Sequence, residues 1–227
     1  MSSISSYDEI HIVSGGKTGS STLFQSFRRL HRNVFHAHNC THLRRSVQCH
    51  QKILVVNSYR LPFSRHISSL FQNIKTHVPG LVLHGQPVLS YSTVANRLDN
   101  YLNNHQFFES YHPMLEMVNM SSLSFSPRQG YSFLPNLLPN MDVILLRFDK
   151  IQEWESQIQS LIPNFRLVPD NLSSRKTYAA LYHYFRKHYR FPPSAKYLWE
   201  VEQPMISVYY SEEEKQVIYQ DFLTILR

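Results

Sequence analysis

This chain of 227 residues has few cysteines, no long apolar run and no internal repeat. Its two cysteines, Cys40 and Cys49, cannot make a disulfide framework, and their spacing is not that of a zinc site. No apolar run reaches the length of a membrane span, and the N-terminus lacks the pattern of a signal peptide. There is no low-complexity tract, and hydrophobic residues make up 42% of the chain. We therefore expect a folded, cytoplasmic protein with no metal and no membrane span.

Acidic residues are also few. The chain has 16 of them against 23 lysines and arginines, a formal net charge of +7. This excess predicts an anionic partner. No helix-turn-helix, RNP or zinc-finger pattern occurs, so we predict no nucleic-acid binding. A highly charged nucleotide or an acidic polymer accounts for the charge equally well.

Apolar strands alternate along the chain with amphipathic helices. We expect strands over 10–13, 33–38, 52–57 and 141–148, and helices over 23–30, 62–74, 149–161, 178–189 and 211–226. The alternation predicts a single α/β domain over 1–227, a three-layer sandwich around a central parallel sheet. Ligands of such sheets bind beyond the carboxyl ends of the strands, so the loops after Val13, His38 and Asn57 should converge on one cleft.

The first strand leads into a turn rich in glycine and hydroxyl groups, and the turn leads into the first helix. Its glycines would let the backbone close on an anion, and its lysine supplies a full positive charge. Free N–H groups at the helix start and the positive end of the helix dipole also favour a phosphate or sulfate. We therefore predict a P-loop-like anion site made by Gly16, Lys17, Thr18, Gly19, Ser20, Ser21 and Thr22.

Two known sequence patterns compete for this turn. The nucleotide-triphosphatase loop G-x-x-x-x-G-K-[ST] is matched by Gly16-Lys17-Thr18, but its first glycine would fall on His11. No later apolar strand ends in an Asp suited to carry magnesium. The order Lys-Thr-Gly-Ser-Ser is instead similar to P-K-[ST]-G-[ST]-[ST]. That is the 5′-phosphosulfate loop of sulfotransferases that use 3′-phosphoadenosine 5′-phosphosulfate (PAPS), with Gly16 here in place of proline.

A second pattern lies where the third strand ends and its helix begins. Arg60 and Ser68 are eight residues apart, and an arginine and a hydroxyl placed there could meet one phosphate. The pair resembles R-x7-S, the second PAPS signature, which holds the 3′-phosphate in sulfotransferases. Relatives usually read V-R-D-P here, so Arg60 is the natural match and Arg65 is the competing phosphate ligand.

Further segments resemble bacterial sulfotransferases of capsular polysaccharide synthesis. They are residues 34–38, 53–73, 129–132, 143–149 and 210–214. The resemblance implies a sulfotransferase that moves a sulfuryl group from PAPS to a hydroxyl or amine of a saccharide or small-molecule acceptor. Adenosine 3′,5′-bisphosphate (PAP) would leave by in-line displacement, with no metal required.

The His-x-His pair at His36 and His38 is similar to that of heparan sulfate 2-O-sulfotransferases, in which a histidine at this place is the catalytic base. His38 is the first choice, because it lies at the mouth of the second strand, and His36 on the same strand face could support or replace it. Lys17 would stabilise the oxygen between the leaving phosphate and sulfur. The other candidate bases are His42, His66 and His112.

The resemblance also bears on adenine and acceptor binding. Tyr131 would stack on adenine, with ordinary packing as the alternative. Segment 84–130 is expected to be an insertion on the acceptor side. Its carboxylates, on Asp99, Glu109 and Glu116, would suit a cationic acceptor such as a guanidinium toxin of the saxitoxin type. The rival interpretations are a P-loop kinase that uses Mg-ATP and a nucleotide-binding relative that has lost catalysis.

Overall fold

The computed structural model describes residues 4–38, 40–72, 74, 82–83, 86–87, 90–104, 130–170 and 178–227. Contacts within the chain divide it into two compact units. The first comprises Met1–Arg60, Tyr111–Asn171 and Pro204–Ser211, and the second comprises Leu61–Ser110, Leu172–Gln203 and Glu212–Arg227. Each unit has its own set of packed apolar side chains.

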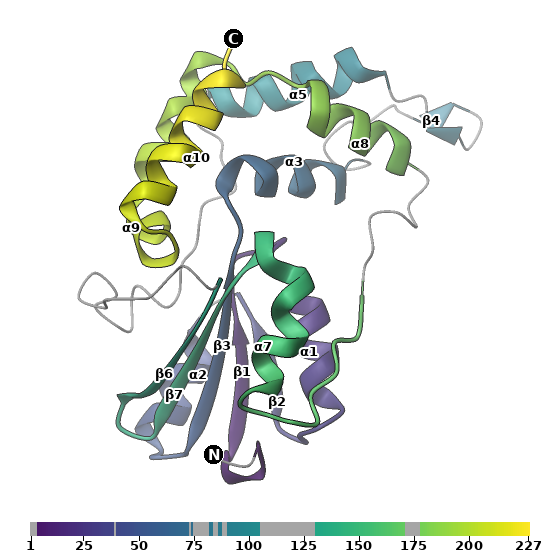
Figure 1. The fold of residues 1–227 in the computed structure, drawn as a ribbon. Coiled ribbons are helices and arrows are strands. Elements are labelled where there is room, and N and C mark those ends of the chain that lie inside the picture. Colours follow the sequence, from purple (N-terminus) through teal and green to yellow (C-terminus); the bar gives the residue numbers. More distant parts are fainter. Residues whose placement is uncertain are drawn as a thin grey trace. The chain divides into compact units, whose positions relative to one another are not determined.

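A five-stranded sheet lies at the centre of the first unit, in the order β2-β1-β3-β7-β6 (Figure 1). The strands are β1 (Glu9–Val13), β2 (Val34–Ala37), β3 (Ile53–Tyr59), β6 (Tyr131–Leu138) and β7 (Met141–Arg147). Strands β2, β1, β3 and β7 are parallel, so their carboxyl ends share one edge of the sheet. The predicted α/β fold is confirmed, and its central sheet is mostly parallel.

The edge strand β6 corrects the prediction of a wholly parallel sheet, because it runs antiparallel to β7. A tight turn joins the two strands, and in it Asn140 takes a left-handed φ of 63°. The sequence did not predict β6, because Pro135 lies within it and Pro139 follows it, and proline removes a backbone hydrogen-bond donor. Pro135 is tolerated because β6 is an edge strand whose pairing with β7 shifts register. Tyr131 is therefore the first residue of a strand.

Helices cover both faces of this sheet. The helices α1 (Ser20–Arg28) and α7 (Trp154–Gln159) pack on one face, and α2 (Thr41–Gln48) lies on the other (Figure 1). The core of the first face includes the buried side chains of Ile10, Ile12, Leu23, Phe27, Leu54, Val56, Ile144, Leu146, Trp154 and Ile158. On the second face, the His42 ring of α2 stacks on Phe35 of β2 with centroids 4.2 Å apart. These layers are consistent with a three-layer sandwich.

The described part of the first unit also holds the short 3₁₀ helices η1 (Ile4–Ser6) and η4 (Phe148–Glu153). The helix expected from residue 149 therefore begins as η4 and continues as α7. The chain passes from β1 through α1 to β2, and then through α2 to β3 on the other side of β1. The loops that follow β1 and β3 consequently open next to each other, the usual ligand position in an open α/β sheet.

The second unit is mainly helical. It holds α3 (Pro62–Gln72), α5 (Tyr91–Asn103), α8 (Ala179–His188), η6 (Pro193–Ala195), the first part of α9 (Lys196–Tyr209), α10 (Glu212–Thr224) and the antiparallel pair β4 (Val82–Leu83) and β5 (Gln86–Pro87). Phe63 stacks on Phe222 with centroids 3.9 Å apart. Tyr182 and Phe185 of α8 and the following Tyr189 are buried and belong to the core of this unit. Among the described residues, no helix is both long and apolar enough for a membrane span.

Part of the expected insertion 84–130 belongs to this unit. Asp99, expected on the acceptor side, accepts a hydrogen bond from Tyr189 Oη at 2.5 Å and pairs with Arg227 at 2.7 Å. Asp99 thus joins α5 to the C-terminal residue. The other residues singled out in this segment lie outside the described residues: Glu109, His112 and Glu116.

Candidate functional site

The turn between β1 and α1 has an unusual backbone. Lys17 has a φ of 70° and Gly19 a φ of 84°, both in the left-handed region. At Gly19 a Cβ would also lie 2.8 Å from Trp154 Cη2, so only glycine fits. At Lys17 the conformation costs about 1–2 kcal/mol for a residue with a Cβ. Strain of this kind clusters at ligand sites, and it makes Lys17 a functional candidate.

Buried hydroxyl groups hold the turn from inside. Thr18 is 1% exposed, and its Oγ1 lies 3.0 Å from Ser14 Oγ and 2.9 Å from the Gly15 carbonyl oxygen. Ser58 of β3 donates to Thr18 Oγ1 at 3.1 Å. The predicted site residue Thr18 therefore supports the turn with its side chain.

The first turn of α1 has backbone N–H groups without intrahelical partners, as every helix does. Gly19 is its N-cap and supplies no side-chain hydrogen bond. At Gly16, which is exposed, a Cβ would meet nothing within 4 Å, so the space beside the turn is open. An anion fits this arrangement of uncapped N–H groups, open space and a nearby lysine.

The hydroxyl residues of α1 have different partners. Ser20 Oγ lies 2.9 Å from His36 Nε2. Thr22 Oγ1 accepts from the Asp170 backbone N–H at 3.2 Å, which ties α1 to the segment after α7. Ser21 is partly exposed in the first turn of the helix. The structure thus brings the predicted residues from Gly16 to Thr22 to one place, with Thr18 and Thr22 in supporting contacts.

Arg60 reaches the same turn from the end of β3. Its Nη1 donates to the Lys17 carbonyl oxygen at 3.3 Å, and its guanidinium carbon lies 4.4 Å from the centre of the Phe148 ring. The side chain is 6% exposed. Arg60 therefore adds a positive charge beside Lys17. Its hydrogen bond to the Lys17 carbonyl oxygen also stabilises the left-handed backbone conformation of Lys17.

His36 of β2 and His38, which directly follows β2, both contact the residues around this turn. His38 Nδ1 lies 2.9 Å from the Ser14 carbonyl oxygen, and the two histidine rings meet edge to face at 5.2 Å. A carbonyl oxygen can only accept, so His38 Nδ1 carries the hydrogen and the Nε2 lone pair is the basic site of the neutral ring. His36 is half-buried, and its pKa is lowered by burial and further by His38.

Three other predicted residues belong to the second unit, and His42 belongs to the first. Ser68 lies on α3, in the second unit, and is partly exposed. Arg65, the competing phosphate ligand, is buried in the same unit and pairs with Glu202 at 2.5 Å, which gives it a structural role. His66 is buried there too. His42 stacks on the α2 face of the sheet and is treated below.

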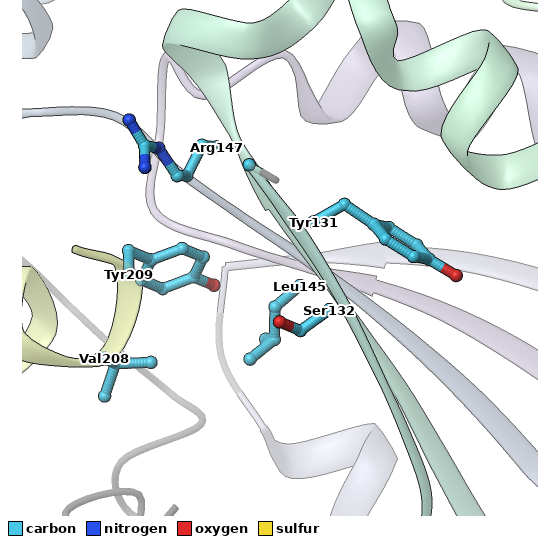
Figure 2. A pocket seen from close by; sticks show the side chains of 7 residues that line it. Tyr131, Ser132, Leu145, Arg147, Val208 and Tyr209 are labelled. Carbon is cyan, nitrogen blue, oxygen red and sulfur yellow. The ribbon is translucent and has the colours of Figure 1, made fainter. Parts of the chain in front are cut away.

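Tyr131 belongs to the face of the sheet that carries α1 and α7. Its ring packs against the core there, and in Figure 2 it points away from Ser132 and Leu145. Burial raises the pKa of its hydroxyl. Packing accounts for this position, and stacking on adenine stays a prediction.

A small hollow opens at the carboxyl end of β7 (Figure 2). Its empty volume is about 200 Å³ with the solvent at its mouth, and it is lined by Gly130, Tyr131, Ser132, Leu145, Arg147, Val208 and Tyr209. Arg147 pairs with Asp149 at 2.7 Å and lies over the Tyr210 ring at 4.1 Å. Burial opposes the charge of Asp149, but hydrogen bonds and the charge of Arg147 outweigh it and lower the pKa of its carboxyl group.

Sequence reasoning missed the residues that support the turn from β3 and α9. Asn57 donates to the Val13 carbonyl oxygen, and Tyr209 donates to Asn57 Oδ1. The sequence held one signal, because Asn57 and Ser58 are polar residues that continue a wholly apolar and buried strand. Nothing local pointed to Tyr209, which is 152 residues away from Asn57.

Comparison with family models, with curated proteins and with solved structures returns no match for this chain. The sulfotransferase resemblance therefore rests on the residues themselves.

Proposed function

We propose that this chain is a PAPS-dependent sulfotransferase. One observation carries the proposal: a strained lysine turn with open space at an uncapped helix start meets two histidines, one at the end of the neighbouring strand and one just after it. The turn suits the 5′-phosphosulfate group, and a basic imidazole beside it suits an acceptor that must lose a proton.

The residues would share the work of an in-line displacement. His38 Nε2 takes the proton of the acceptor hydroxyl or amine as the acceptor–sulfur bond forms. The bond between sulfur and the bridging oxygen breaks, and its electron pair stays on the phosphate of PAP. Lys17 and the N–H groups of α1 stabilise the charge that develops there. Arg60 keeps Lys17 in place through the carbonyl oxygen of the lysine.

A kinase that uses Mg-ATP is the weaker alternative. Its P-loop threonine would have to present a hydroxyl to magnesium. Here the Thr18 hydroxyl is buried against Ser14, Gly15 and Ser58. These contacts favour a role inside the turn.

Isothermal titration calorimetry with PAP, AMP and Mg-ATP tests the nucleotide. We expect PAP to bind. Lys17→Ala should weaken the affinity for PAP by about 10-fold or more, because a charged contact is lost. Arg29→Ala removes an equal charge from the exposed end of α1 and should leave affinity within about twofold. Binding of Mg-ATP without binding of PAP would replace the proposal with the kinase.

Mass spectrometry of candidate acceptors tests catalysis. Incubation with PAPS should add one sulfuryl group to a saccharide or small-molecule acceptor and release PAP. PAP binding without turnover on any acceptor of the panel would favour the relative that has lost catalysis.

A further inference from the structure

A second cluster of polar side chains lies in the first unit, on the sheet face covered by α2. Glu9 and His11 are two residues apart on β1, so their side chains share one face of the strand. His42 comes from the first turn of α2. One ligand atom from each of the three residues lies within 4.8 Å of the others.

The contacts within the cluster are close. His11 Nε2 lies 2.7 Å from Glu9 Oε2, and the side chains are 1% and 12% exposed. The His11 and His42 rings lie 5.4 Å apart, and Phe35 stacks on both. Ser46 Oγ lies 3.4 Å from His42 Nδ1, one turn along α2. The ligand atoms are therefore held by apolar stacking and by neighbours outside the set.

We propose that Glu9, His11 and His42 form a binding site for Zn²⁺, with water as the fourth ligand. Two imidazole nitrogens and one carboxylate oxygen are an established zinc donor set, and such sets favour borderline transition metals over Mg²⁺ or Ca²⁺. Zn²⁺ would take the place of the proton shared by His11 and Glu9, and Ser46 would orient His42 from outside the ligand set. His42 is exposed, so the ion can reach the site from solvent.

The ion would lie apart from the Lys17 turn. Glu9 and His11 lie four and two residues before Val13, the last residue of β1, which is about 13 Å and about 7 Å along the strand. Zn²⁺ would join β1 to α2 and hold the strand that carries the turn. The inference does not rest on the proposed sulfotransferase activity, and it is tested without turnover.

Calorimetry and thermal unfolding of chelator-treated full-length protein test the site. We expect one Zn²⁺ per chain, a melting temperature that rises with Zn²⁺, and no such rise with Mg²⁺. Co²⁺ in its place should give the visible absorption of a tetrahedral site. His42→Ala and Glu9→Gln should each weaken Zn²⁺ binding by about 100-fold or more.

His183→Ala is the matched control, because His183 is an exposed histidine of α8. It should leave Zn²⁺ affinity unchanged. Both ligand variants should keep the circular dichroism spectrum of the apoprotein, which separates loss of binding from loss of folding. If one variant does not fold, the Zn²⁺ affinity of the other variant decides. Full Zn²⁺ affinity in His42→Ala or Glu9→Gln, or equal binding of Mg²⁺, would overturn the site.

Discussion

His36 in β2 and His38 just after it contact the same turn region through different atoms. His38 directs Nδ1 to a carbonyl oxygen and leaves Nε2 as the basic atom, whereas His36 uses Nε2 toward Ser20. We predict that His38→Ala lowers kcat by about 100-fold or more and leaves PAP affinity nearly unchanged. His36→Ala should lower kcat less and weaken PAP binding, because Ser20 belongs to the helix start.

Steady-state kinetics and calorimetry of both variants check this assignment. An active His38→Ala beside an inactive His36→Ala would make His36 the base.

Gly19 and Gly16 offer a matched pair of substitutions in one turn. Gly19→Ala forces a Cβ into the left-handed region and against Trp154, and we expect a loss of more than about 1 kcal/mol in the free energy of unfolding. Gly16→Ala meets open space and should change it by less than about 0.5 kcal/mol. Urea unfolding of the two variants measures both. Equal stabilities would contradict the packing of Gly19 on Trp154.

At the scale of elements, the end of β3 supports the turn after β1. Arg60 donates to the Lys17 carbonyl oxygen, so its effect on nucleotide binding passes through the turn. We predict that Arg60→Ala weakens PAP and AMP by a similar factor, about 10-fold. Calorimetry with the two nucleotides checks it. A loss confined to PAP would instead assign Arg60 to the 3′-phosphate, as the second signature implies.

At the scale of the whole molecule, buried neutral histidines make the fold sensitive to acid. The pKa of His11 and His36 is lowered in the first unit, in each case mainly by burial. In the second unit, burial and then the charge of Arg65 lower the pKa of His66 to about 4. Between about pH 6.5 and pH 4 the unfolded chain binds a proton at His66 that the folded chain does not. The free energy of unfolding therefore falls as pH falls through this window.

His66→Gln should remove its share of this pH dependence, on the order of 3 kcal/mol between neutral pH and pH 4. Urea unfolding at about pH 7 and about pH 4.5 measures the slope. His183→Gln, at an exposed histidine, should keep the slope of the wild type. An unchanged slope in His66→Gln would mean that His66 does not carry the acid sensitivity.

How much could be predicted from the sequence depends on the range of the interaction. Apolar periodicity located β1, β3, β7 and α3, because the side-chain spacing of strands and helices is a local property. Side chains alternate along a strand, which predicted that His36 and His38 share one face. The glycines and hydroxyl residues of segment 14–22 predicted the turn. The edge strand β6 escaped because its prolines break the pattern while its position at the edge tolerates them.

By itself, the sequence determined which residues form the strand, the turn and the helix, since the backbone preferences of glycine and the apolar spacing act over a few residues. Only the tertiary structure decided which side chains meet across the sheet. It put Ser58 on Thr18, Arg60 on the Lys17 carbonyl oxygen, and Glu9 and His11 beside His42. It also set Arg65 against Glu202. These contacts join residues 31 to 137 positions apart, and they form because buried polar groups must find partners wherever packing brings the chain together.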